Sequence, residues 1–168
     1  ALASDKALRA LDGLPDDVRP DARRACRPFG ENCGFTMSES AQIMVLFDDD
    51  LALELGAPTL AAIPDVFVSA DGPKKSISGP GVGNYVTFAK SASLLKNLLG
   101  DRHFSAGGVV QAHGTSTPQN RVTESQIMSQ VAVAMGVEKW TVGAIKSFIG
   151  HSLGAAAGDQ LSAMLGVW

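Results

Sequence analysis

Three side chains suited to catalysis lie in two short stretches of this sequence. His113 heads a polar loop behind one apolar run, while Lys146 and His151 follow a second apolar run. Histidine changes its protonation state near neutral pH and presents ring nitrogens that donate or accept hydrogen bonds. Each histidine also neighbours a glycine, Gly114 or Gly150. This combination predicts an active site rather than two structural histidines buried in a core.

Hydrophobic periodicity indicates the elements that position these residues. Short β-branched stretches predict buried strands at Gly107–His113 and Thr141–Ile145. Apolar residues at helical spacing predict helices at Glu124–Met135 and from Leu153 to Leu165. Strands that alternate with helices are typical of a layered α/β domain, in which the loops at the carboxyl ends of the strands carry chemistry.

The preceding part of the chain contributes further predicted elements. Three consecutive aspartates at 48–50 are explained as a helix cap and first turn, so we expect no metal site there. The predicted elements are a strand at Ile43–Phe47, a helix from Asp48 through Leu55 that Gly56 stops, a strand within Leu60–Ala70, a loop at Asp71–Asn84 and a helix at Tyr85–Leu99 that Gly100 ends.

Composition restricts the classes of function. The chain has 168 residues, of which 45% are hydrophobic and 18% charged, with a net charge of −3. Such a chain is globular, and neither a nucleic acid nor a membrane is an expected partner. Its two cysteines form neither a disulfide framework nor a zinc set, and we expect a cytoplasmic protein. The sequence begins at Ala1 and stops in a helical pattern at Trp168, so we expect a piece of a longer protein.

A serine hydrolase is one alternative. Gly150–Gly154 reads GHSLG and matches G-x-S-x-G, the turn that presents a nucleophilic serine between a strand and a helix. Ser152 would be that nucleophile. In that fold an acid and then a histidine follow the serine, whereas Asp159 follows Ser152 here and no histidine does. The chain order therefore argues against this alternative.

Two motifs resemble the β-ketoacyl-acyl-carrier-protein synthases, or ketosynthases. QAHGTSTP, followed by Glu124, and KSFIGHSLGAAAG are similar to the family's HGTxTP and KSxxGHxxGAAG segments. Upstream, CRPFGENCGFTMSESAQIMVLFDD also resembles a family segment, so the likeness covers roughly residues 26–167. It implies the C-terminal half of the thiolase-like fold, layered α, β, α, β, α, over residues 26–168. Residues 1–25 are then a surface or connecting segment, and we expect truncation at both ends.

The resemblance also implies roles for individual residues. Ketosynthases join an acyl thioester to a malonyl thioester that loses carbon dioxide, and the resulting enolate needs hydrogen-bond donors. His113 and His151 would support decarboxylation, and Lys146 would orient the site and bias its protonation states. Glu124 matches a glutamate thought to hold the lysine, while Thr115 and Thr117 match threonines that bind the pantetheine arm. Acyl carrier protein is the implied partner and the parent is expected to be a homodimer, with no cofactor beyond the phosphopantetheine that carries the substrates.

Several positions depart from the family pattern. No cysteine stands in the family's nucleophile context, and we expect neither Cys26 nor Cys33 to be the nucleophile. The chain alone is therefore expected to be inactive. Asn120 and Arg121 replace a Gly-Asp pair, and serines and a glutamine replace small residues within GFTMSESAQ, which indicates a divergent branch or different packing. A non-catalytic subunit of the chain-length-factor kind is a second alternative, although the retained histidines and lysine argue against it.

Overall fold

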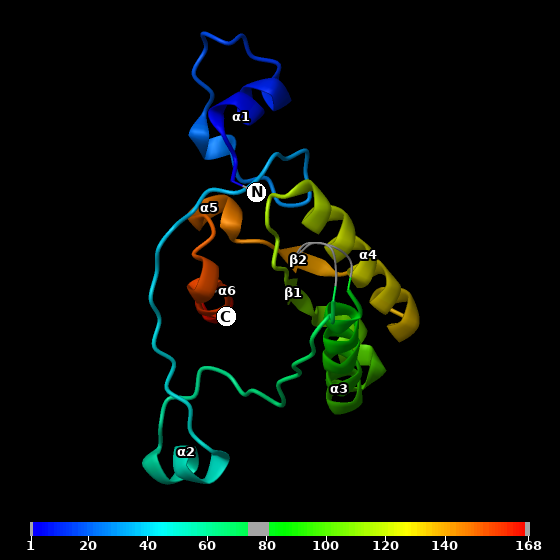
Figure 1. Cartoon of the computed structure of the whole chain (residues 1–168). Coiled ribbons are helices and arrows are strands. Elements are labelled where there is room, and N and C mark those ends of the chain that lie inside the picture. Colours follow the sequence, from blue (N-terminus) through cyan, green and yellow to red (C-terminus); the bar gives the residue numbers. More distant parts are fainter. Residues whose placement is uncertain (1, 74–80, 167–168) are drawn as a thin grey trace.

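The computed structural model describes residues 2–73 and 81–166, so part of the loop expected at Asp71–Asn84 lies outside the described residues. Helices and two short strands follow one another along the chain (Figure 1). Their bounds are α1 Asp5–Asp12, the 3₁₀ helix η1 Ala22–Arg24, α2 Asp49–Leu55, α3 Val82–Gly107, β1 Val109–Gln111, α4 Pro118–Met135, β2 Thr141–Gly143, α5 Lys146–Ile149, the 3₁₀ helix η2 Leu153–Ala155 and α6 Ala156–Leu165.

Strands β1 and β2 form a parallel pair at the centre of the molecule (Figure 1). Val110 pairs with Val142, and the backbone N–H of Ala112 donates to the carbonyl of Gly143 at 2.9 Å. Helix α4 makes the crossover between the strands, as a parallel pair requires. Both predicted strands are thus confirmed, although each is shorter than expected. Because the strands are parallel, their carboxyl ends lie side by side, and so do the loops that follow them.

Helices α3 and α4 pack together beside the strands and enclose the main hydrophobic core (Figure 1). The ring of Trp140 lies 5.7 Å from that of Phe88 and 5.9 Å from that of Phe104. Its Nε1 donates to the carbonyl of Met128 at 3.0 Å, which satisfies the indole polar group inside the cluster. Buried residues of this core are Ala92, Phe104, Val131, Ala132 and Val137.

One predicted helix boundary is wrong and another is confirmed. Helix α4 begins at Pro118 rather than at Glu124, with Thr117 as its N-cap. Proline is favoured at the first helical position because its missing N–H has no partner there, so this signal was present in the sequence. In α3 the backbone is non-helical at Gly100, with φ 73° and ψ 160°, and helix then continues to Gly107. Gly100 therefore ends the first helical part, as the sequence predicts, and a second helical part follows the kink up to Gly107.

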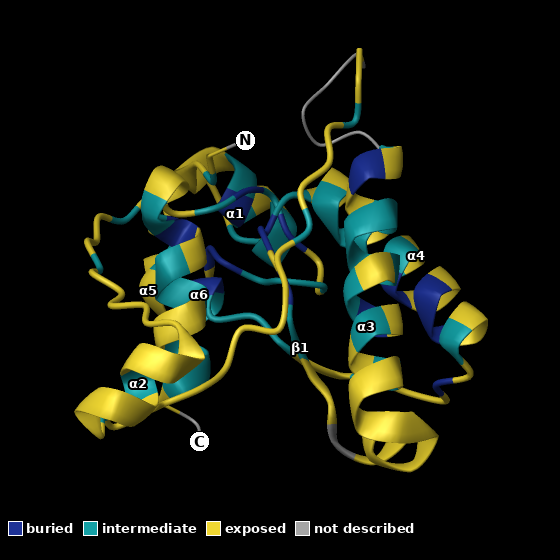
Figure 2. Ribbon diagram, turned by 90° about the horizontal axis from the view of Figure 1, so that it is seen from below, coloured by how far each residue is buried: buried dark blue, intermediate teal, exposed yellow. Residues whose placement is uncertain are grey.

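The strands predicted at Ile43–Phe47 and within Leu60–Ala70 are wrong. The chain is extended there without strand pairing and its side chains face solvent, as the yellow trace near α2 in Figure 2 shows. Ile43 is 92% exposed and Val68 is 89% exposed. An apolar run becomes a strand only when another strand takes up its backbone hydrogen bonds, and within the described residues β1 and β2 pair only with each other.

Between these extended stretches the predicted helix is confirmed as α2. The Asp48 carboxylate accepts from the backbone N–H of Leu51 at 2.8 Å, which is an N-cap, and Gly56 ends the helix in the left-handed conformation. The aspartate cluster is thus explained by capping.

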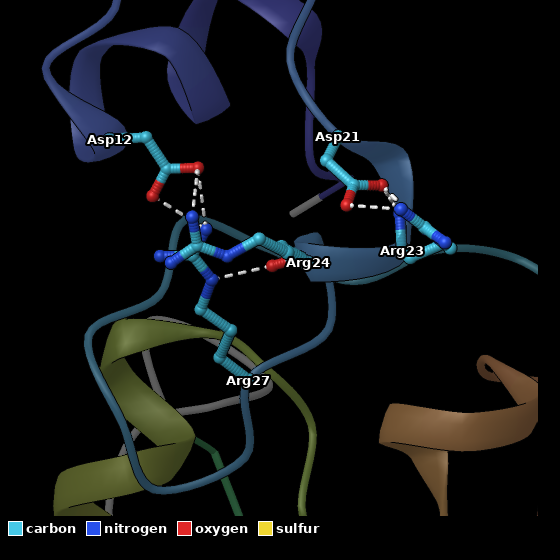
Figure 3. Close-up of polar contacts among 5 residues, drawn as sticks. All are labelled: Asp12, Asp21, Arg23, Arg24 and Arg27. Carbon is cyan, nitrogen blue, oxygen red and sulfur yellow. Dashed lines mark hydrogen bonds and ion pairs between the residues drawn. The ribbon is translucent and has the colours of Figure 1, made fainter.

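The amino-terminal segment is anchored by an ion-pair cluster. Arg27 donates to both carboxylate oxygens of Asp12 at 2.7 and 2.8 Å, and Arg24 lies 3.7 Å from the same carboxylate (Figure 3). Leu8 of α1 is only 2% exposed. Helix α1, which belongs to the segment predicted to be a surface or connecting one, is therefore fixed against the chain that leads to Phe35.

Candidate active site

The loop that follows β1 places His113. The Glu124 carboxylate on α4 accepts from the backbone N–H groups of His113 at 2.6 Å and Gly114 at 2.9 Å. Gly114 has φ 55°, and a Cβ there would lie 2.8 Å from the Cβ of Ala144. Glycine is required both by this left-handed backbone and by the close approach of the two loops. Glu124 thus holds the His113 loop through main-chain groups.

Lys146 begins α5 and is buried, with 2% of its surface exposed. Its Nζ donates to the backbone carbonyl of His113 and lies 3.5 Å from the Nδ1 of the same residue. The two strand-end loops are therefore joined by the lysine that the sequence singled out.

His151 lies in the turn between α5 and η2 and is 8% exposed. Its backbone N–H donates to the carbonyl of Thr36 at 2.8 Å. Its Nδ1 accepts from the backbone N–H of Leu153 at 3.1 Å. Leu153 adopts φ 57°, which is uncommon for a residue with a side chain and marks strain that the surrounding structure must hold. No signal in the sequence indicates this backbone contact.

The two histidine rings lie close together and share a tautomer. Their centroids are 5.2 Å apart and their planes meet at 79°. The Nδ1 of His151 accepts from Leu153, and the Nδ1 of His113 faces the ammonium of Lys146, which has only donors. With Nδ1 as the acceptor, each neutral ring carries its proton on Nε2. The pair therefore presents two ring N–H donors.

The electrostatics keep both rings neutral. Three causes lower the pKa of His113 to about 4: burial of the imidazole contributes most, followed by the Lys146 cation and then by His151. The residue is nevertheless exposed at the cavity described below. Burial, with a smaller contribution from Lys146, lowers the pKa of His151. Burial also lowers the pKa of Lys146, whereas the charges of Glu124 and Asp159 act in the opposite direction. At neutral pH His113 is therefore uncharged beside a lysine whose charge two carboxylates favour.

A cavity of about 770 Å³ opens over the histidine pair. Polar groups on its wall include Thr115 and Thr117, and apolar side chains fill much of the remainder, among them Phe35, Phe88, Ile127, Met128 and Leu153. A pocket with an apolar wall and a few converging polar groups is the usual form of a site for a small organic group.

The threonine pair on this wall is held by hydrogen bonds. The hydroxyls of Thr115 and Thr117 lie 3.1 Å apart, and the Asn120 side-chain oxygen accepts from the backbone N–H of Thr115 at 3.1 Å. Arg121 donates to the carbonyl of Gly30 at 2.6 Å. Asn120 and Arg121, which depart from the family pattern, thus build the wall and link it to the amino-terminal part of the chain.

The cysteines lie elsewhere. The Cys26 thiol is buried and accepts from the backbone N–H of Thr36 at 3.1 Å. Burial raises the pKa of Cys33, which disfavours the reactive thiolate. Neither residue is among the described residues that line the cavity.

Ser152 is oriented away from a hydrolase arrangement. Its hydroxyl donates to the carboxylate of Asp159, and the neighbouring His151 uses its Nδ1 to accept from a backbone N–H. A nucleophilic serine instead donates to a histidine that acts as its base. Asp159 is a residue whose structural importance the sequence did not indicate.

The adjoining strand ends, paired histidines and buried lysine form one site of an α/β fold, and matches to known proteins support the thiolase-like fold that the motifs imply. The family profile "Beta-ketoacyl synthase, C-terminal domain" matches residues 60–166. The chain is 53% identical over its full length to Beta-ketoacyl-[acyl-carrier-protein] synthase FabY of Pseudomonas aeruginosa, and covers 26% of that protein. It is 32% identical over 92% of its length to 3-oxoacyl-[acyl-carrier-protein] synthase 2 of Synechocystis sp., of which it covers 35%.

A solved structure agrees with these relatives. The crystal structure of the noncanonical ketosynthase FabY from P. aeruginosa superposes with a TM-score of 0.92 at 54% identity, over 99% of this chain and 26% of that one. The chain belongs to the β-ketoacyl synthase family and corresponds to its C-terminal domain. It spans about a quarter to a third of the length of these relatives. Among the described residues, no helix has the length and apolar character needed to cross a membrane.

Proposed function

We propose that this chain is the decarboxylating half of a β-ketoacyl-acyl-carrier-protein synthase active in fatty-acid or related biosynthesis. The supporting observation is the histidine pair: both Nδ1 atoms face donors, which leaves an Nε2–H group on each of two side chains that line one cavity. Acyl carrier protein is the proposed partner, with the malonyl and acyl groups as thioesters. The parent is proposed to be a cytoplasmic homodimer that needs no cofactor beyond the phosphopantetheine of its substrates.

In this reaction the malonyl carboxylate leaves as carbon dioxide, and the electron pair of the broken C–C bond forms a thioester enolate. The Nε2–H groups of His113 and His151 donate to the enolate oxygen as its charge develops. In other enzymes, removal of one such donor lowers the rate by a factor of about 10²–10³. The enolate carbon then attacks the acyl thioester carbonyl, a new C–C bond forms and the nucleophile leaves as a thiolate. Lys146 fixes His113 through its carbonyl and Nδ1.

The nucleophile that carries the acyl group lies outside this chain in the proposal. Cys26 accepts a backbone hydrogen bond inside the fold, and burial raises the pKa of Cys33. Residues 1–168 alone are therefore proposed to have no turnover, and condensation by that isolated chain would contradict this point. Thr115 and Thr117, on the cavity wall, are proposed to hydrogen-bond the pantetheine arm, whose amides need such partners.

The test is mass analysis of the full-length parent after incubation with an acyl thioester. The proposal expects an acyl adduct on a cysteine outside residues 1–168, which malonyl-acyl-carrier-protein then removes as a β-ketoacyl product. An adduct on Ser152 would indicate the hydrolase. A parent that shows no adduct and releases no carbon dioxide would be a subunit that keeps the fold without the reaction.

A further inference from the structure

A polar cluster next to the turn that carries His151 is not used by the reaction steps described above. The carboxylate of Asp159, on the first turn of α6, accepts from the Ser152 hydroxyl and from the Gln42 side-chain amide. Ser40 is a further hydrogen-bond partner of this carboxylate. The cluster thus joins the extended segment 40–42, the turn that carries His151, and α6.

The cluster includes two of the departures from the family pattern in GFTMSESAQ. Ser40 and Gln42 stand where the family has small residues, and both point their polar groups to Asp159. Gly158 makes room for this arrangement, because a Cβ there would clash with the side-chain oxygen of Gln42. The replacements at 40 and 42 therefore belong to one network with Asp159 rather than to unrelated surface changes.

Asp159 is also connected to both histidine loops. Ser152 follows His151 directly in the chain, and the strained residue Leu153, which donates to His151 Nδ1, follows Ser152. On the same helix turn, Gln160 donates to the carbonyl of Ala112, the residue before His113. The first turn of α6 thus contacts the residues adjoining both members of the histidine pair.

We propose that Asp159 is a positioning residue for the condensation: through Ser152 it fixes the turn that orients His151, and its charge supports the Lys146 cation. This inference rests on the proposed ketosynthase function. The charged and titratable groups that face Lys146 are His113 after β1, Glu124 on α4, His151 after α5, Asp159 on α6 and Cys26 near η1. Glu124 and Asp159 are the carboxylates of this set, and Glu124 also holds two backbone N–H groups.

Two variants of the full-length parent separate the two roles. Asp159→Asn removes the charge, whereas Ser152→Ala removes the link to the turn and retains the charge. Both variants should lose roughly ten- to hundredfold in kcat for condensation, since small misplacement of a catalytic group costs up to about 10²-fold. Acyl loading of the nucleophile should stay within twofold, because that step does not require His151 to face an enolate. Asp159→Asn alone should shift the alkaline limb of the pH–rate profile to lower pH, because it removes a charge that raises the pKa of Lys146.

The double variant tests whether both residues act through one link. If they do, Ser152→Ala combined with Asp159→Asn should cost little more than Asp159→Asn alone. Asp101→Asn is the matched control, because Asp101 is an exposed aspartate paired with Lys96 on α3. Wild-type kcat in both single variants would overturn the inference, and so would a rate loss shared equally by acyl loading and condensation. If Asp159→Asn does not fold, Ser152→Ala alone decides by the same criteria.

The outcomes also separate this inference from the proposed function. A wild-type parent that neither loads acyl groups nor releases carbon dioxide would defeat the ketosynthase proposal itself. A wild-type parent with both activities, and variants indistinguishable from it, would defeat only the role of Asp159.

Discussion

The Nδ1 of His113 lies 3.5 Å from the Nζ of Lys146, and the same Nζ donates to the His113 carbonyl. This relationship sets the tautomer of the ring, because an ammonium offers only donors. Burial is the largest cause of the lowered pKa of His113, and the nearby cation lowers it further because it disfavours an imidazolium. A buried lysine that takes no part in bond formation can thus determine what His113 presents to a substrate.

Replacement of Lys146 should change the acid limb of the pH–rate profile. In the wild type His113 stays neutral down to a pKa of about 4, below its usual 6.5, so the rate should not fall as the pH passes through 6.5. Protonation would place a second donor on Nδ1, facing the donors of Lys146. Lys146→Met removes the cation and should raise the pKa of His113, which moves the acid limb toward neutral pH. The measurement is the pH–rate profile of carbon dioxide release by the full-length parent.

Lys139→Met is the control for this prediction, because Lys139 is exposed and precedes β2. It should leave the acid limb unchanged. An acid limb near 6.5 in the wild type, or the same limb in Lys146→Met, would show that the cation does not govern His113.

Glu124→Gln should loosen the His113 loop. The carboxylate accepts from two backbone N–H groups, whereas an amide offers a single oxygen and would direct N–H donors at one of them. Hydrogen bonds to charged groups contribute about 1.5–3 kcal/mol each, so we expect a loss of that order in the free energy of unfolding. The loss of charge should also lower the pKa of Lys146 further. Chemical denaturation and the alkaline limb of the pH–rate profile measure the two effects. A variant with wild-type stability would contradict the anchoring role.

Gly114→Ala should destabilise the protein more than Gly13→Ala. Both glycines have a positive φ, of 55° and 64°, but a Cβ at 114 would meet Ala144 at 2.8 Å, whereas one at 13 would meet nothing within 4 Å. The shared backbone strain costs about 1 kcal/mol or more, and overpacking typically adds about 1–3 kcal/mol at 114 alone. Ala144→Gly in the Gly114→Ala background should recover part of the difference. Thermal unfolding of the three variants measures this, and equal Tm losses for the two alanines would contradict the close approach.

Ser152 should not react with a fluorophosphonate probe. Its hydroxyl donates to the weakly basic Asp159 carboxylate rather than to a histidine that could take its proton. Labelling of the full-length parent, followed by peptide mass analysis, tests this, with Ser152→Ala as the control. A stoichiometric adduct on Ser152 would require the hydrolase interpretation.

The sequence predicted the residues at the strand ends well, because adjacency there follows from topology. Two parallel strands with a helical crossover must bring their following loops together. The sequence alone therefore predicted that His113, Lys146 and His151 lie in one site. Helix α2 was also predictable, because its N-cap at Asp48 and its C-terminal glycine at Gly56 depend only on residues that are neighbours in the sequence.

Features that depend on distant partners were not predictable. The apolar runs at Ile43–Phe47 and Leu60–Ala70 satisfy the strand pattern, but pairing requires another strand edge, which no local pattern specifies. In the Asp159 cluster, Gln42 and Asp159 are hydrogen-bonded although they lie 117 positions apart in the sequence, so no sequence motif predicts the contact. The strained φ of Leu153 likewise comes from tertiary packing around the turn.

The most direct test of the central claim is the rate of carbon dioxide release from malonyl-acyl-carrier-protein by the full-length parent with His113→Ala or His151→Ala. If the two Nε2–H groups stabilise the enolate, each variant should lose about 10²–10³-fold in this rate while still forming the acyl adduct on its nucleophile. Decarboxylation at the wild-type rate in either variant would contradict the claim that this histidine pair performs the chemistry.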